Sequence, residues 1–133
     1  MGIERRSPTL DEFRTLASSV GWLDHFDWST MQGSLDGSLF SVVATEEGHV
    51  VGTGRVVGDG VRYFYLQDVM VSPAHAENGI ATQLVGELLA WILVNAAPKA
   101  FIGLFSSPDA EGVYEQHGFS AADDMTGMRR LIG

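Results

Sequence analysis

The stretch DVMVSPAHAENGIAT, residues 68–82, combines the end of a strand, a turn and the start of a helix. Apolar residues at 69–71 predict a strand that Ser72-Pro73 interrupts, and an apolar-striped helix follows Gly79. Because the first turn of a helix leaves its backbone N–H groups unpaired, such a turn is suited to bind phosphate. The residues predicted to form this turn are Glu77, Asn78, Gly79, Ile80, Ala81 and Thr82.

A second informative stretch, residues 101–119, begins with the apolar run FIGLF. This run predicts a buried strand, and Ser107-Pro108 opens a short helix that carries Tyr114 and ends at Gly118. A strand, a long helix and a second strand in this order form a β-α-β crossover. The two strands should therefore be parallel neighbours.

Together the two stretches resemble the signature of the GCN5-related N-acetyltransferase (GNAT) superfamily. Its pyrophosphate-loop pattern is Gln/Arg-x-x-Gly-x-Gly/Ala, in which Gly79 and Ala81 fit the last two fixed positions and Ala76 stands at the first. Its second pattern is Asn-x-x-Ala-x-x-x-Tyr-x-x-x-Gly-Phe, and Ser107 stands at the asparagine. The residues that match this second pattern are Ala110, Tyr114, Gly118 and Phe119. The resemblance runs from the region of Phe40 to the C-terminus.

The resemblance implies an α/β (α+β) GNAT fold, in which a mixed, mostly antiparallel sheet with one splayed parallel strand pair is flanked by about four helices. In that fold the splay admits the pantetheine arm of the co-substrate acetyl-CoA. The residues that would contact acetyl-CoA are Val69, Met70, Val71, Ser107 and the turn residues 77–82, and Tyr114 would lie beside the thioester sulfur. The implied activity is transfer of an acetyl group to a primary amine by direct attack. The resemblance leaves the oligomeric state open between a monomer and a homodimer.

The acidic composition indicates which kinds of partner the protein can bind. Seventeen acidic residues against eight basic ones give a formal net charge of −9, and Lys99 is the only lysine. Nucleic-acid binding needs clustered cations, so it is not expected here. Coenzyme A would have to be held by neutral backbone amides, whereas the negative field favours a small cationic amine as acceptor.

Length and residue usage predict a single domain over residues 1–133. The chain contains no cysteine, and its four histidines are scattered, so a metal site is not expected. No stretch approaches the roughly 18 apolar residues that span a bilayer. The expectation is a cytoplasmic protein without a membrane partner.

The rest of the chain predicts an N-terminal helix followed by antiparallel strands. Thr9 and Glu12 form a capping box, and apolar residues recur at helical spacing until Gly21. Residues 22–36 predict a loop with a short second helix. The strand at 61–71 is long enough to need a bulge. The predicted strands cover residues 39–45, 49–57, 61–71, 100–105 and 125–132, and the long helix covers residues 79–94.

Tyr114 and Asp68 are the catalytic candidates. An alkylamine with a pKa of about 10.4 is only about one part in a thousand neutral at pH 7, so a group that accepts its proton would help. Asp68 stands in an otherwise apolar strand beside the expected groove, and it could be this base or could fix the neighbouring loop. Tyr114 would donate a hydrogen bond to the departing thiolate. Asp24, His25 and Asp27 could line the acceptor side.

Two alternatives accompany this interpretation. Ala76, Glu77 and Ser107 all remove or oppose expected contacts with the co-substrate, which would suit a non-catalytic acyl-CoA-binding regulatory module. Tyr114 would be unnecessary in such a module. The end of the chain resembles small-amine acetyltransferases of the arylalkylamine and glucosamine-phosphate types, and a protein or peptide amine is the other acceptor considered.

Overall fold

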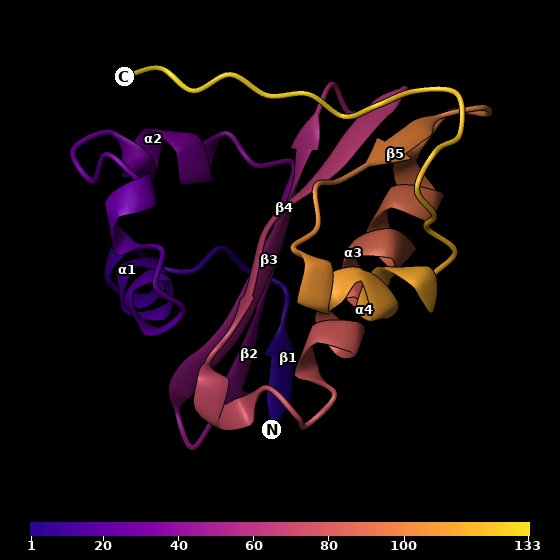
Figure 1. Ribbon diagram of the computed structural model, residues 1–133. Coiled ribbons are helices and arrows are strands. Elements are labelled where there is room, and N and C mark those ends of the chain that lie inside the picture. Colours follow the sequence, from indigo (N-terminus) through magenta and orange to yellow (C-terminus); the bar gives the residue numbers. More distant parts are fainter.

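The computed structural model describes residues 1–133 as one mixed sheet with helices on both faces. The strands are β1 (Gly2–Glu4), β2 (Phe40–Glu46), β3 (His49–Gly58), β4 (Tyr63–Val71) and β5 (Phe101–Gly103). The helices are α1 (Leu10–Ser19), α2 (Met31–Asp36), α3 (Ile80–Asn95) and α4 (Glu111–Glu115), with 3₁₀ turns η1 (Leu23–His25), η2 (Pro73–His75) and η3 (Pro108–Ala110). Helices α1 and α2 lie on one face of the sheet and α3 and α4 on the other (Figure 1).

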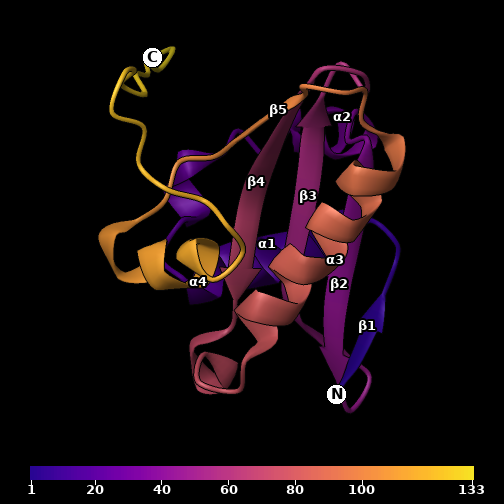
Figure 2. The same ribbon diagram turned by 90° about the vertical axis from the view of Figure 1, so that its right-hand side faces the viewer.

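The strands lie in chain order, β1-β2-β3-β4-β5, as Figure 2 shows face-on. The first four strands pair antiparallel, and β4 pairs parallel with β5. This mixed sheet with one parallel pair confirms the fold class expected from the sequence. No helix is both long enough and apolar enough to cross a membrane.

Each face of the sheet has its own apolar core. The larger core lies against α3, whose fully buried residues include Leu84, Leu88 and Ile92 at helical spacing. The smaller core lies under α1 and includes Phe13, Leu16 and Met70 of β4. Burial of each such side chain contributes about 1.5–3 kcal/mol, so both helices are fixed to the sheet by packing.

The N-terminal helix and the hairpin confirm the sequence expectations. The Thr9 hydroxyl accepts from the Glu12 amide at 3.1 Å, and the Glu12 carboxylate accepts from the Thr9 amide at 2.8 Å. Strands β2 and β3 are joined at Glu47 and Gly48, both with positive φ. Such a two-residue turn suits the right-handed twist of a hairpin.

The expected bulge lies in β4 at Asp68. Thr53 pairs with Met70 and Arg55 pairs with Gln67, so one residue of β3 faces two residues of β4. Asp68 has φ +53°, a left-handed conformation that is uncommon outside glycine. A bulge of this kind breaks the regular ladder and changes the direction of the strand at this point.

Arg55 holds the bulge in place. Its Nε donates to Asp68 Oδ2 at 2.9 Å, and both side chains are largely buried. Arg55 also donates to the carbonyl and hydroxyl oxygens of Ser34 and to the hydroxyl of Ser38, at 2.9–3.1 Å. One guanidinium thus ties β3, the β4 bulge and the end of α2 together.

Strand β4 separates from β5 soon after their pairing begins. The pairing covers only Tyr63 to Tyr65 opposite Phe101 to Gly103. Beyond Tyr65, β4 continues to Val71 with no strand on this side. The splayed parallel pair expected from the sequence is therefore present.

Four features of the strands differ from the sequence expectations. The strand predicted at 125–132 is wrong: this segment has no regular structure and runs across the end of the sheet (Figure 1). The outer strand β5 is only three residues long, so its free edge offers few backbone groups for pairing. Strand β4 begins at Tyr63 because Asp59 Oδ1 accepts from the amides of Val61, Arg62 and Tyr63 and holds a turn there. The short strand β1 was not predicted.

Replacing Arg55 tests whether the guanidinium stabilises the bulge. Arg55→Leu leaves the Asp68 carboxylate largely buried without its cation, so we expect a loss of about 3–5 kcal/mol in the free energy of unfolding. The matched control is Arg5→Leu, which removes the exposed Arg5–Glu87 pair and should cost less than about 1 kcal/mol. Urea unfolding measures both, and equal losses would contradict the assignment.

Candidate functional site

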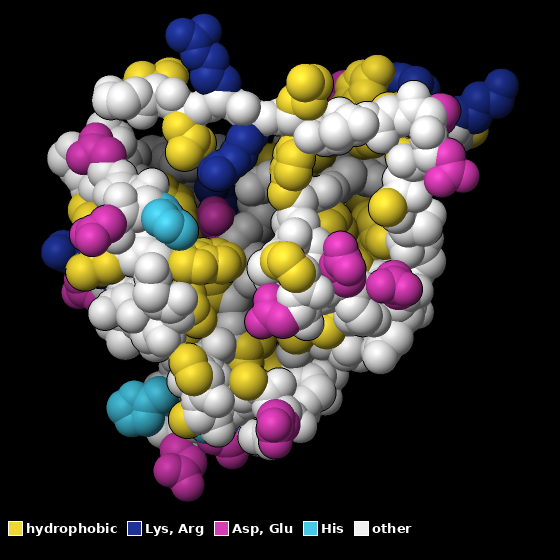
Figure 3. All heavy atoms as spheres, in the orientation of Figure 1, with side chains coloured by type: hydrophobic (Ala, Val, Ile, Leu, Met, Phe, Trp, Pro, Cys, Tyr) yellow, Lys and Arg dark blue, Asp and Glu magenta, His cyan; other side chains and the backbone are white.

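A cleft of about 190 Å³ opens where β4 and β5 separate. Its lining residues are Trp22, Leu66, Gln67, Asp68, Val69, Phe105, Ser107, Ala110 and Tyr114. Figure 3 shows this face hollowed between the half that carries α1 and α2 and the half that carries α4. Four residues predicted to form the site, Asp68, Val69, Ser107 and Tyr114, are therefore brought together in one cleft.

Tyr114 presents its hydroxyl from a buried ring. The side chain is 9% exposed, and its ring packs edge-on against Phe119 with centroids 6.1 Å apart. The phenol makes no hydrogen bond within the protein. Burial raises the pKa of Tyr114 above its ordinary value. Tyr114 is therefore a neutral hydrogen-bond donor at physiological pH.

Asp68 faces the same cleft from β4. Its Oδ2 accepts from Arg55 Nε, while Oδ1 makes no hydrogen bond within the protein. The hydrogen bond joins Asp68 to a neighbouring strand, whereas the structural role considered from the sequence was to fix the neighbouring loop. The second oxygen leaves the carboxylate able to accept from a bound molecule as well.

The backbone amides of β4 point alternately toward β3 and toward the opening between β4 and β5. The amide of Ser72 donates to the carbonyl oxygen of Val51 on β3 at 2.7 Å, and Met70 pairs with Thr53 of the same strand. Because successive residues of a strand point their amides to opposite sides, those of Val69 and Val71 face away from β3. The Met70 side chain is buried under α1. Neither the side chain nor the amide of Met70 therefore faces the opening, and Met70 does not line the cleft.

The turn before α3 has four free amides. Gly79 has φ +72° and no side-chain cap. The amides of Gly79, Ile80, Ala81 and Thr82 have no backbone acceptor, as expected for the first turn of a helix. A Cβ added to Gly79 would meet nothing within 4 Å, so the space beside this glycine, at the start of the run of free amides, is open. Glu77 and Asn78 are exposed beside them.

Two hydrogen bonds tie the helix of Tyr114 to this turn. The Thr82 hydroxyl donates to Gln116 Oε1 at 3.2 Å, and His117 Nε2 lies 3.1 Å from the Thr82 carbonyl oxygen. These contacts connect the end of α4, which carries Tyr114, to the first turn of α3, where the free amides lie.

The acceptor side differs from the sequence expectation. Asp24, His25 and Asp27 do not line the cleft, whereas Trp22 does. Asp27 accepts from the hydroxyls of Ser29 and of the following threonine, and these bonds lower its pKa below the ordinary value. The sequence analysis missed Trp22, although Gly21 with φ +81° marks the turn that places it.

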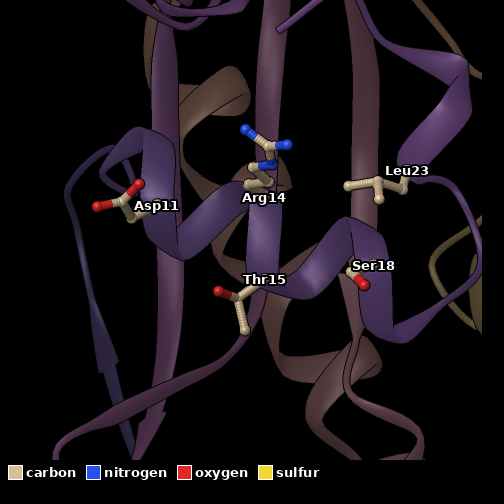
Figure 4. A pocket seen from close by; sticks show the side chains of 5 residues that line it. All are labelled: Asp11, Arg14, Thr15, Ser18 and Leu23. Atoms are coloured by element: carbon tan, nitrogen blue, oxygen red, sulfur yellow. The ribbon is translucent and has the colours of Figure 1, made fainter.

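A second depression, of about 360 Å³, lies on the outer surface of α1. Figure 4 shows its lining side chains, Asp11, Arg14, Thr15, Ser18 and Leu23. Four of these come from one helix, and none was predicted to form the site. The depression is a shallow feature of the helix surface, and it shares no lining residue with the cleft of Tyr114 and Asp68.

Comparisons with known proteins agree with this geometry. The family profile described as acetyltransferase (GNAT) domain matches residues 18–130. A comparison with curated proteins finds no match. A solved structure of a probable acetyltransferase from meticillin-resistant Staphylococcus aureus superposes with a TM-score of 0.91 at 19% identity, covering 99% of this chain and 98% of that chain. A GNAT-family acetyltransferase from Streptococcus pneumoniae gives 0.83 at 27% identity, covering 98% and 97%.

A further solved structure contains a substrate analogue. The protein AAC(6')-Iy, in complex with the bisubstrate analogue CoA-S-monomethyl-acetylneamine, superposes with a TM-score of 0.70 at 19% identity. The match covers 98% of this chain and 98% of that chain. At this identity the likeness concerns the fold.

The environment of Tyr114 predicts a contribution to stability that depends on pH. The folded state keeps the phenolic proton more tightly than the unfolded chain, so stability falls as pH rises from about 10 through the raised pKa. We expect Tyr114→Phe to remove part of this fall. Urea unfolding of both proteins at pH 8 and pH 10.5 measures the effect, and identical pH dependence would refute it.

Proposed function

The chain belongs to the acetyltransferase (GNAT) domain family, and on that premise we propose that it transfers the acetyl group of acetyl-CoA to a small cationic primary amine. The observation that carries the proposal is the cleft between β4 and β5, which both Tyr114 and Asp68 line. Tyr114 is a neutral hydrogen-bond donor that suits a departing thiolate. Asp68 is a carboxylate that can accept a proton or a hydrogen bond from an amine.

Acetyl-CoA would lie along the free backbone groups. Its pyrophosphate would sit over the amides of residues 79–82, flanked by Glu77 and Asn78, where the helix N-terminus supplies partial positive charge without a basic side chain. The pantetheine arm would follow Val69, Met70 and Val71 into the cleft, with Ser107 on the other wall. This path ends at the Tyr114 hydroxyl.

The reaction needs no nucleophile from the protein. The neutral amine nitrogen attacks the thioester carbonyl carbon and forms the C–N bond, and collapse of the adduct breaks the C–S bond. The departing sulfur carries the negative charge and accepts a hydrogen bond from Tyr114. The excess proton on nitrogen leaves to Asp68 or water, and the thiolate is protonated to give coenzyme A.

Asp68 would act on the amine through the oxygen that Arg55 leaves free. Oδ1 can accept a hydrogen bond from an N–H of the substrate amine. Once the amine has lost its excess proton, this hydrogen bond orients the nitrogen lone pair. The net charge of −9 also favours a cationic acceptor over an anionic one. The bisubstrate analogue bound to AAC(6')-Iy supports the use of coenzyme A by this fold.

A non-catalytic acyl-CoA sensor is the second candidate. Glu77 is exposed beside the free amides, where its negative charge opposes a pyrophosphate, and Ala76 supplies no compensating cation. These residues weaken binding without touching the amides themselves. A sensor would bind acetyl-CoA and release no thiol with any amine.

Thiol release from acetyl-CoA tests the proposal against a panel of arylalkylamines, polyamines, aminosugars and short peptides. We expect release with one class of small amine, and Tyr114→Phe should lower turnover by about 10²-fold because it removes a donor to the leaving thiolate. Calorimetry should find acetyl-CoA affinity nearly unchanged in the variant.

Tyr63→Phe is the matched control for Tyr114→Phe, because Tyr63 is 42% exposed on β4 and does not line the cleft. Its turnover should equal that of the wild type. Full turnover in Tyr114→Phe would remove this residue from the mechanism, and binding without release for any amine would favour the sensor.

Filling the space over the turn tests where the pyrophosphate binds. Gly79→Trp should lower acetyl-CoA affinity by more than about 10²-fold, because the indole occupies the space over the free amides. Gly48→Trp is the matched control, since Gly48 also has positive φ and open space around its Cβ position. Both variants should lose similar stability, measured by urea unfolding. Retained affinity in Gly79→Trp, measured by calorimetry, would contradict the assignment.

A further inference from the structure

Helix α4, which carries Tyr114, depends on its neighbours for its position. It is five residues long, and the chain before η3 (residues 104–107) and after Gly118 (residues 119–133) contains no helix or strand. A helix this short is not stable on its own in water. The contacts that α4 makes with α3, beside which it lies in Figure 2, therefore decide where the Tyr114 hydroxyl sits.

The hydrogen bonds that join residues 107–119 to other elements both end on Thr82. The Thr82 hydroxyl donates to Gln116 Oε1 at 3.2 Å, in an exposed position, and His117 Nε2 lies 3.1 Å from the Thr82 carbonyl oxygen, in a half-buried one. A hydrogen bond that is shielded from water is electrostatically stronger than an exposed one. His117 is therefore the firmer of the two links.

The ring of His117 must donate in this contact. A carbonyl oxygen only accepts, so Nε2 carries a hydrogen, and it does so in one neutral tautomer and in the charged ring alike. The ring also lies against α3, because a Cβ added to Gly86 would be 3.5 Å from His117 Cε1, an ordinary packing distance. His117 is thus fixed to α3 by both a hydrogen bond and packing.

His117 is in turn bonded to the backbone of Tyr114. The His117 amide donates to the Tyr114 carbonyl oxygen at 2.9 Å, and the Phe119 amide donates to the same oxygen at 3.2 Å. A chain of hydrogen bonds consequently runs from the Thr82 carbonyl through His117 to the residue that carries the phenol.

Thr82 also belongs to the turn at which the pyrophosphate is proposed to bind. Its amide is one of the four in the first turn of α3 that have no acceptor. Thr82 would therefore bind the co-substrate through its N–H while its carbonyl and hydroxyl groups hold the segment of Tyr114. A change in the position of this turn would be passed to Tyr114 through His117.

We propose, resting on the function proposed above, that His117 is a positioning residue that links pyrophosphate binding at Thr82 to the placement of the Tyr114 hydroxyl beside the thioester sulfur. His117 does not line the cleft, so it acts on the reaction only through Tyr114. Misplacement of a reacting group by about 1 Å can cost about 10²-fold in rate, so this link should affect turnover more than affinity.

Steady-state kinetics of thiol release, with the best acceptor of the panel above, test the positioning role. His117→Ala should lower kcat by about 10-fold and change the dissociation constant of acetyl-CoA, measured by calorimetry, by less than about 2-fold. His117→Gln should restore most of kcat, because its side-chain amide keeps an N–H donor. His49→Ala is the matched control and should keep the wild-type kcat, since His49 is exposed at the start of β3 and does not line the cleft.

A double variant shows whether His117 acts through Tyr114. In the Tyr114→Phe background, His117→Ala should lower kcat by less than about 2-fold, because the hydroxyl that His117 positions is already absent. A role in stability alone would lower kcat by the same factor in both backgrounds.

NMR of isotope-labelled tyrosine rings tests the link without catalysis. The probe is adenosine 3′-phosphate 5′-diphosphate, which carries the diphosphate and lacks the acyl-carrying arm that would reach Tyr114. At saturating concentrations the probe should shift the Tyr114 ring signals in the wild type and leave them unshifted in His117→Ala. The spectrum of Tyr114→Phe identifies these signals among those of the three tyrosines.

The outcomes separate this proposal from the proposed function. Equal losses of kcat in the two backgrounds, no rescue by His117→Gln, or Tyr114 shifts that persist in His117→Ala would each overturn the positioning role while the acetyltransferase activity stands. If no amine of the panel releases thiol, the proposed function fails instead, and the NMR measurement alone decides whether His117 links Thr82 to Tyr114.

Discussion

The site depends on the contact between Arg55 and the Asp68 bulge. A regular β4 would continue its ladder with β3 in one register, and its side chains would alternate without interruption. The extra residue at Asp68 shifts that register, and Arg55 stabilises the shift from the neighbouring strand while also bonding to Ser34 and Ser38. The same guanidinium therefore sets the backbone beside the cleft and the position of α2 across from it.

The proposed binding of an anionic co-substrate requires no clustered cations. The protein's net charge is −9, and the turn at the start of α3 presents free amides with no basic side chain near them in sequence. Amides and a helix N-terminus act only at short range, so they do not conflict with an acidic surface that attracts amines. Burial raises the pKa of Tyr114 and keeps it neutral, so in the proposed mechanism it would stabilise the leaving thiolate in the same way, as a neutral donor.

Local patterns in the sequence predicted the elements that local chemistry determines. The capping box at Thr9, the β2-β3 hairpin and the α3 helix follow from neighbouring residues, and all are present. The length of the strand at 61–71 predicted a bulge but not its position, which is Asp68. Asp68 and Tyr114 could be predicted beside one groove because the resemblance to the GNAT signature implies a splay between the two strands and a tyrosine beside the thioester, and both residues line the cleft.

The sequence did not predict the contacts between residues that lie far apart in the chain. The bond between Arg55 and Asp68 joins two strands, and the placement of Trp22 depends on how the loop after α1 packs. An apolar pattern predicted a strand at 125–132, but pattern alone does not supply a partner edge, and β5 is too short to provide one. Each miss concerns packing in three dimensions.

The splay of β4 from β5 leaves the amides of Val69 and Val71 without a neighbouring strand, and in the proposed function they hold the acyl-carrying arm. Amide hydrogen exchange followed by NMR, with and without saturating acetyl-CoA, would test this role, and Met70 is the internal reference because it pairs with Thr53 of β3. We expect Val69 and Val71 to exchange faster than Met70 in the free protein and to gain protection relative to it on binding. Unchanged exchange at Val69 and Val71, with acetyl-CoA bound, would contradict it.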